Sequence, residues 1–482
     1  MVMSFFLTFI LISIGGFLCI PSYNLRLLRV YALAVSFVVF WLSLVLLLKF
    51  DSNTLNFQYY ETFNWLDLFN LSWSVGVDGL SIFFIILTTV LIPFTILSSW
   101  YSIKYRLKEF LFLLLLVEFL LIAFFSSLDL VFFYVFFESL LIPLFFMIGV
   151  WGSRQRKIHA VYQFFFYTLT GSLVLLVGLF VIYFTCGSTD IEVLYHTYFS
   201  ESKQILLWLA FFLPFAVKVP MVPFHLWLPE AHVEAPTAGS VLLAGVLLKL
   251  GTYGFLRFSL PLFPFASSYF VPLIYTMTII ALVYTSATTL RQIDLKKIIA
   301  YSSVAHMNFL LLGLFSSTIE GVEGSLFLML SHGLVSSGLF LLIGILYDRY
   351  KSRLLFYYGG LVQLMPIWTI FFFVFILANL SFPGTSNFIG ELLVLMGLVQ
   401  RNTLATLLAA LTLILGAAYS IWCFNRMSFG HVGSMNYFGD MTRREFFVMF
   451  PLFVLVVLLG FFPNLVFSNI HINCYDLVFF GV

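Results

Sequence analysis

The sequence predicts an all-α protein that crosses a membrane many times, with about fourteen transmembrane helices. Of its 482 residues, 62% are hydrophobic and only 9% are charged, whereas a soluble domain is about half apolar and about a quarter charged. Apolar runs of about 20 residues, enough to cross a bilayer, recur from one end of the chain to the other. A soluble protein could not hide so much apolar surface, so a cytosolic enzyme, a disordered chain and a secreted disulfide scaffold are excluded.

The apolar runs place the fourteen helices along the chain. Their approximate positions are 3–20, 30–49, 79–100, 110–127, 129–150, 159–185, 205–228, 236–258, 270–290, 296–317, 322–347, 363–399, 403–425 and 447–467. The first run has no basic n-region and no clear small-residue cleavage site, so we expect a retained helix rather than a signal peptide. Loops leave no room for a soluble domain, and residues 1–482 are expected to form a single membrane domain.

The charges in the loops support this helix count. Seventeen of the 23 Lys and Arg residues lie in or beside the loops that follow odd-numbered runs, and the loops after even-numbered runs hold mostly acidic residues. A miscounted helix would scramble this alternation. By the positive-inside rule both termini face the trans side, which in a mitochondrion is the intermembrane space.

Two predicted helices are interrupted. The seventh contains Pro214, Pro220 and Pro223, and the twelfth carries the sequence Ser-Phe-Pro-Gly-Thr-Ser-Asn at 381–387. Proline removes a backbone donor and clashes with the preceding turn, and broken helices persist in a membrane only where protein or a watery cavity satisfies the freed groups. The two interruptions lie five helices apart, which predicts two five-helix repeats with a transport site at their interface.

Six ionisable residues lie at bilayer depth, where a charge costs roughly 2.5–3.5 kcal/mol on insertion scales. They are Glu138, Lys218, Lys249, His306, His332 and Glu391. Carboxylate, amine and imidazole groups exchange protons when burial and pairing bring their pKa values together, so we interpret the set as a proton relay in which the histidines bridge. The alternative is structural, because buried ion pairs can also fix the register of helices.

Other polar groups allow more than one interpretation. Glu118, inside the fourth helix, fits either function or a hydrogen bond between helices. The cluster His225, Glu230, His232 and Glu234 could in principle bind a metal, but its spacing matches no zinc pattern, and a polar network at a helix end or a proton entrance is favoured. The four cysteines form no C-x-x-C pair, no nucleotide-binding motif is present, and a net charge of +2 without a polybasic block argues against nucleic acid as a partner.

Several motifs together resemble the antiporter-like membrane subunits of respiratory complex I, in their mitochondrial form of plant or algal type. The resemblance covers nearly the whole chain, and the stretch from His225 to Thr237 is its most specific part. The motifs are Phe137–Pro143, Gly149–Arg154, Ala216–Pro223, His225–Thr237, Leu247–Gly254, Ile299–Met307 and Pro383–Glu391.

The resemblance implies a fold with two inverted repeats of five helices, at about 110–258 and about 270–425. It implies proton translocation in the mitochondrial inner membrane, coupled to quinone reduction elsewhere in the complex. Glu138 and Lys218 would be the first pair of the relay, Lys249 its central lysine and Glu391 its last group, with His306 and His332 connecting them.

The resemblance also implies partners. NADH, FMN, iron–sulfur clusters and ubiquinone would be bound by other subunits and none by this chain, and the neighbours would be other membrane-arm subunits, especially the sister antiporter-like subunits, together with lipids. Glu391 separates the chain from the sister subunit that carries Lys at this position. Cation/proton antiporter subunits share the same Glu and Lys positions and are the alternative.

Overall fold

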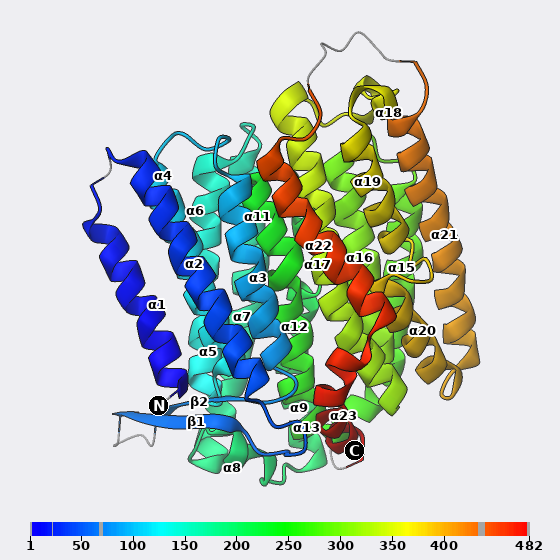
Figure 1. The fold of residues 1–482 in the computed structure, drawn as a ribbon. Helices are drawn as coiled ribbons and strands as arrows, with labels where there is room; N and C mark the ends of the chain where they lie inside the picture. The colour runs from blue at the N-terminus through cyan, green and yellow to red at the C-terminus, as the bar shows by residue number, and fades with distance from the viewer. Residues whose placement is uncertain (1, 22, 67–70, 432–438, 480–482) are drawn as a thin grey trace.

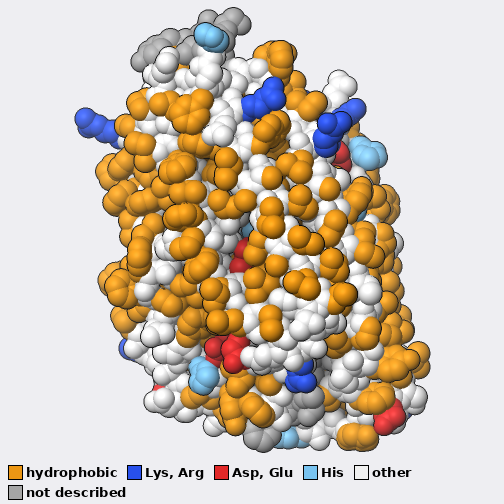
Figure 2. Space-filling view, turned by 90° about the vertical axis from the view of Figure 1, so that its right-hand side faces the viewer, with side chains coloured by type: hydrophobic (Ala, Val, Ile, Leu, Met, Phe, Trp, Pro, Cys, Tyr) orange, Lys and Arg blue, Asp and Glu red, His pale blue; other side chains and the backbone are white. Residues whose placement is uncertain are grey.

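Long apolar helices lie side by side and run from one end of the molecule to the other (Figure 1). The structure is a computed structural model, and it describes residues 2–21, 23–66, 71–431 and 439–479. Hydrophobic side chains cover the face drawn in Figure 2, and most charged side chains on that face lie toward its two ends. This distribution is the one that a lipid environment requires of a membrane protein.

Eleven helical segments among the described residues are long and apolar enough to cross a membrane. They are α1 (Val2–Cys19), α2 (Leu25–Leu48), α4 (Leu107–Ser126), α5 with α6 (Leu130–Ser139, Leu141–Trp151), α7 (Lys157–Cys186), α11 to α13 (Thr237–Leu262), α15 (Val271–Thr289), α16 (Leu295–Leu314), α17 (Ile319–Tyr350), α21 (Thr403–Ser428) and α22 (Arg443–Phe461).

The other three predicted spans are also helical. They correspond to α3 (Ile82–Ser98), to α9 (Glu201–Lys218) followed by α10 (Trp227–Glu234), and to α19 (Pro366–Asn379) followed by α20 (Ser386–Val399). The predicted class, a polytopic helical membrane protein with two broken helices, is therefore confirmed. Shorter helices complete the chain: α8 (Ile191–Tyr195), α14 (Pro264–Tyr269), α18 (Leu361–Leu364), α23 (Asn464–Phe479) and a 3₁₀ turn at Leu355–Tyr357.

One β-hairpin departs from the all-α prediction. Strands β1 (Gln58–Leu66) and β2 (Leu71–Val77) pair antiparallel within the predicted loop 50–78, with Phe63 opposite Trp73. The segment is rich in Tyr, Trp and Phe, which favour strands, and the ladder satisfies backbone groups that a loop would leave to water. The hairpin lies across the end of the bundle where both chain termini are found, here called the hairpin end (Figure 1).

Both predicted helix breaks are present, and side chains satisfy the carbonyl groups that they free. At the first break, after α9, the Trp227 indole donates to the Val217 carbonyl (2.9 Å), and the Asn308 amide donates to the Pro220 carbonyl (3.3 Å). At the second, between α19 and α20, Gly384 has a φ of +94°, a conformation that favours glycine. The first break is thus buried against protein, as membrane helices require, whereas Phe382 and Pro383 at the second break are exposed on the surface of this chain.

Two helices form the centre of the bundle. The α11–α13 segment and α17 are the most deeply buried of the eleven spans. They approach closely at Gly245 and Gly333, because a Cβ added to Gly333 would lie 3.0 Å from the Gly245 carbonyl oxygen. Small residues that let backbones approach are typical of contacts between membrane helices, and here the approach lies one turn from Lys249 on one helix and beside His332 on the other.

Candidate functional site: a buried row of Lys, His and Glu

The centre of the site is a direct contact between Lys249 and His332. The Lys249 Nζ atom lies 3.0 Å from the His332 Nδ1 atom and donates to the Ala244 carbonyl at 2.5 Å. Both side chains are almost fully buried. The contact joins the two central helices at the level of their glycine approach.

The backbone around Lys249 is widened. The α-helix α12 (Leu248–Gly254) lies between two π-helical turns, at Leu243–Leu247 and Phe255–Ser259. Such turns are rare and are frequent at functional sites. The first of them contains Ala244, whose carbonyl accepts from Lys249.

The row continues from His332 to Glu391 through His306. The rings of His306 on α16 and His332 on α17 lie with their centroids 5.5 Å apart. The His306 Nδ1 atom lies 2.9 Å from the Glu391 Oε1 atom of α20. Four of the six predicted residues, from four different helices, therefore form one continuous row inside the bundle.

Two atoms of this row are left without protein partners. His306 Nε2 and Glu391 Oε2 are buried and form no hydrogen bond among the described residues. A cavity of about 20 Å³ lies beside them, and its walls include Asn379 and Tyr419. This volume is enough for about one water molecule. A water molecule in this cavity would satisfy the two buried atoms.

Glu138 and Lys218 lie apart from this row. Lys218 is buried at the end of α9, and its Nζ atom forms no hydrogen bond among the described residues. It lies 4.6 Å from the centroid of the Phe137 ring, so the aromatic face next to Glu138 contacts the ammonium group. Glu138 lies close enough to interact electrostatically with Lys218. The two predicted partners are neighbours through Phe137 and Coulomb attraction, and no ion pair within 4.0 Å joins them.

A close helix contact places Lys218 next to the helix of Lys249. A Cβ added to Gly251 on α12 would lie 3.1 Å from the Lys218 Cβ atom and 2.9 Å from the Phe215 carbonyl oxygen. Only glycine fits at this approach. The end of α9, where Lys218 lies, therefore packs directly on the helix that carries Lys249.

His232, from the polar cluster of the sequence, also lies near the row. It is fully buried, its ring stacks on Phe340 with centroids 4.8 Å apart, and neither ring nitrogen has a hydrogen-bond partner among the described residues. It interacts electrostatically with Lys249 and Lys296. The sequence placed this histidine at a helix end, and only the folded chain brings it near the central lysine.

The C-terminal end of α10 is held by two buried cations. Arg353 donates to the Val233 carbonyl and lies 3.6 Å from the Glu234 carboxylate, and both of these side chains are buried. Lys296 donates to the Ala235 carbonyl at 2.8 Å. Positive charge at a helix C-terminus is favoured by the helix dipole. The predicted polar network at this helix end is present, and the described residues contain no group of three His, Cys, Asp or Glu side chains arranged for a metal.

A second buried ion pair, which the sequence interpretation did not identify, fixes the other end of the Lys249 helix. Arg257 donates to Asp78 at 2.8 Å and to the Tyr253 hydroxyl at 2.9 Å. Asp78 lies just after β2. This pair anchors the helix to the hairpin end.

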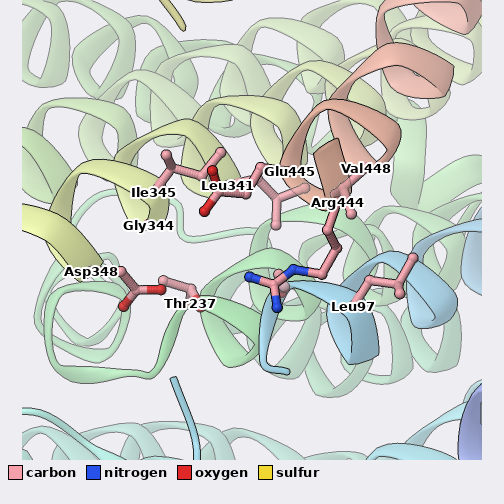
Figure 3. A pocket seen from close by; sticks show the side chains of 10 residues that line it. Leu97, Thr237, Leu341, Gly344, Ile345, Asp348, Arg444, Glu445 and Val448 are labelled. Atoms are coloured by element: carbon pink, nitrogen blue, oxygen red, sulfur yellow. The ribbon is translucent and has the colours of Figure 1, made fainter. Parts of the chain in front are cut away.

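A third charged group lies at the opposite end of the bundle. Figure 3 shows Arg444 reaching from α22 toward Leu97 and Thr237, with Asp348 beside them. The Arg444 guanidinium also lies over the Tyr101 ring, 4.4 Å from its centroid. None of the six predicted site residues lines this small cavity, so the group belongs to the packing of the helix ends.

A bundle with two broken helices and a buried row of ionisable side chains defines a membrane transport protein by fold and site. A sequence model of the family described as "NADH:quinone oxidoreductase/Mrp antiporter, TM" matches residues 127–461. This match spans more than half of the chain, and the chain belongs to that family.

Two relatives are similar over almost their whole length. The chain is 57% identical to NADH-ubiquinone oxidoreductase chain 4 of the red alga Chondrus crispus over 470 residues, which are 97% of this chain and 96% of the relative. It is also 57% identical to the protein of the same name from Arabidopsis thaliana, over 96% of this chain and 94% of the relative.

Two solved structures have a fold similar to that of this chain. A chain of respiratory complex I from Thermus thermophilus, solved with bound NADH, is 29% identical and superposes with a TM-score of 0.90 over 99% of both chains. A chain of the Mrp complex from Dietzia superposes with a TM-score of 0.86 over 98% of this chain and 97% of that chain, at 18% identity. At that identity the second similarity shows the fold alone.

Proposed function

We propose that this chain is a proton-translocating membrane-arm subunit of a mitochondrial NADH:ubiquinone oxidoreductase. The observation that carries the proposal is the row Lys249, His332, His306 and Glu391, whose members contact one another in the membrane interior. Membership of the family, and high identity to relatives named as chain 4 of that enzyme, support the same function.

The row suits stepwise proton transfer because it begins at an amine that can donate a proton, continues through two imidazoles that can both accept and donate one, and ends at a carboxylate that can accept it. A protonated Lys249 donates to His332 Nδ1, and an imidazole that accepts a proton on one nitrogen can release one from the other. His306 then presents its own Nδ1 to Glu391. The ring-to-ring step between the histidines, whose centroids lie 5.5 Å apart, needs a bridging water or a small rotation of one ring.

Lys218 and Glu138 supply the control of this row in our proposal. Lys218 is buried with no hydrogen bond, and the charge of Glu138 stabilises its ammonium form. If Glu138 moves away or is neutralised, a desolvated Lys218 loses stabilisation of its charge. Since α9 packs on α12 at Gly251, two residues from Lys249, a change of charge at Lys218 would reach Lys249 through this helix contact.

The same proposal also predicts the orientation of the chain in the membrane, its internal repeats and its partners. The termini would face the intermembrane space, because the basic loops lie at the end opposite the hairpin end and the positive-inside rule orients them to the matrix. Residues 110–258 and 270–425 would be the two inverted repeats of one membrane domain. NADH, FMN, iron–sulfur clusters and ubiquinone would be bound by partner subunits, and sister antiporter-like subunits and lipids would adjoin this chain.

The proposal is tested first in native membranes and then by Glu138→Gln. Gentle solubilisation, native electrophoresis and mass spectrometry should find the chain in a large band that oxidises NADH. Glu138→Gln should leave that band intact and lower coupled NADH oxidation several-fold, whereas Glu201→Gln, an exposed carboxylate at the start of α9, should change neither. A small NADH-inactive assembly would reject membership of the enzyme, and normal coupled turnover in Glu138→Gln would reject the role of Glu138.

A further inference from the structure

A groove of about 550 Å³ opens on the membrane-facing side of the hairpin end, and the relay does not use it. Its walls come from the start of α15, the end of α16 and the α20–α21 loop. Most of the lining is apolar, from Val271, Pro272, Ile279, Phe315 and Leu404. The groove therefore resembles a slot for a hydrocarbon chain more than a site for a polar solute.

The groove begins near the membrane surface and extends toward the membrane interior. Its mouth lies where α15 begins at Val271 and α21 begins at Thr403. Its floor reaches Ile279, eight residues further along α15, which is about 12 Å at 1.5 Å per residue. A ligand that fills it would place one end at the interface and the other among lipid tails.

Arg401 stands at the mouth of the groove. It is exposed, and its Nη2 atom donates to the Ser317 carbonyl at 3.1 Å. No carboxylate among the described residues lies within 4.0 Å of it. The loops at this end of the molecule are mostly acidic, so a cation here runs against the charge pattern that orients the protein. A guanidinium next to an apolar slot at the membrane surface complements a phosphate that carries hydrocarbon chains.

We propose that this groove binds one membrane phospholipid, with its phosphate on the Arg401 guanidinium and an acyl chain along α15 between Val271 and Ile279. Ser317 positions the guanidinium through its carbonyl, and Leu404 covers the chain from α21. The site is independent of the relay, since none of the six relay residues lines the groove.

The test uses the purified complex and two photoactivatable probes with the same diazirine-bearing acyl chains, a phosphatidylcholine and a diacylglycerol that lacks the phosphate. Peptide mapping should find phosphatidylcholine adducts on residues 271–279 at least five times as often as diacylglycerol adducts. Arg401→Gln should remove this preference. Thr276→Trp, which fills the groove from an exposed position, should remove both adducts.

Arg291→Gln, an exposed arginine in a loop outside the groove, serves as the control and should keep the preference for phosphatidylcholine. Two results would overturn the proposal. One is equal labelling of the groove by phosphatidylcholine in the wild type and in Arg401→Gln. The other is an absence of adducts on residues 271–279 in the wild type, which is the result expected if a neighbouring subunit fills the groove.

Discussion

The Lys249 Nζ atom lies 3.0 Å from the Nδ1 atom of His332, although the two residues are 83 positions apart in the sequence. The contact depends on the approach of two helices at Gly245 and Gly333, where one backbone nearly touches the other. The proton transfer that we propose between these side chains would thus depend on helix packing as much as on their own chemistry.

Gly333→Leu is expected to disrupt this contact. Even a Cβ atom at this position would lie 3.0 Å from the Gly245 carbonyl oxygen, and overpacking a buried position typically costs about 1–3 kcal/mol. The helices should separate, so proton uptake should fall several-fold and the melting temperature of the complex should decrease. Gly15→Leu, where nothing lies within 4 Å of the added Cβ, is the control, and equal effects of the two variants would contradict this account.

Glu391→Gln tests the far end of the row. The amide can still hydrogen-bond with His306, so the fold should be kept, but it cannot take up a proton. We expect NADH-driven proton uptake in vesicles to fall by more than half while the complex assembles normally. Glu320→Gln, an exposed carboxylate at the start of α17, should match the wild type, and full proton uptake by Glu391→Gln would show that Glu391 carries no proton.

Phe137→Leu tests the contact between an aromatic face and Lys218. A cation over a ring is stabilised by about 0.5–2 kcal/mol, and the change removes this contact together with some packing. Phe133→Leu is a matched control because Phe133 is equally buried on the same helix and contacts no cation. Coupled NADH oxidation should fall more in Phe137→Leu than in Phe133→Leu at similar assembly. The role of the ring at Lys218 would be refuted by equal losses.

Arg353→Gln tests the end of α10. It leaves the buried Glu234 carboxylate without its cation, and breaking a buried pair in this way costs about 3–5 kcal/mol. The amount of assembled complex and its melting temperature should drop. Adding Glu234→Gln should restore part of the loss, because the unpaired charge is then gone. A double variant no better than the single one would mean that Arg353 acts through the Val233 carbonyl instead.

Much of the fold could be predicted from the sequence because the bilayer leaves few choices. Apolar runs and the charge alternation of the loops predicted the spans. Pro214, Pro220 and Pro223 predicted the first break, and the sequence Ser-Phe-Pro-Gly-Thr-Ser-Asn at 381–387 predicted the second. The β-hairpin was not predicted, since at 58–77 it lies outside the bilayer, where the apolar runs carry no signal. The π-helical turns around Lys249 were not predicted either, because they depend on packing between helices.

The site was predicted as a set of residues but not as an arrangement. Lys249, His306, His332 and Glu391 stood out because charged groups are costly in a membrane. The order in which these residues contact one another could not be predicted, because it depends on how four helices pack together in the folded chain. The sequence also paired Glu138 with Lys218, and in the structure the two interact electrostatically, with the Phe137 ring against the Lys218 Nζ atom and no direct ion pair between them. Their roles in proton transfer remain predictions.

The central claim is that protons cross this chain through Lys249, and the most direct test is the number of protons pumped per NADH oxidised. Lys249→Met keeps a long unbranched side chain and removes the amine that carries the proton, and Lys203→Met, at an exposed lysine on α9, is the control. In sealed vesicles with matched amounts of assembled complex, we expect Lys249→Met to lower this ratio or to stop coupled turnover, with Lys203→Met unchanged. A wild-type ratio at a wild-type rate in Lys249→Met would contradict the account.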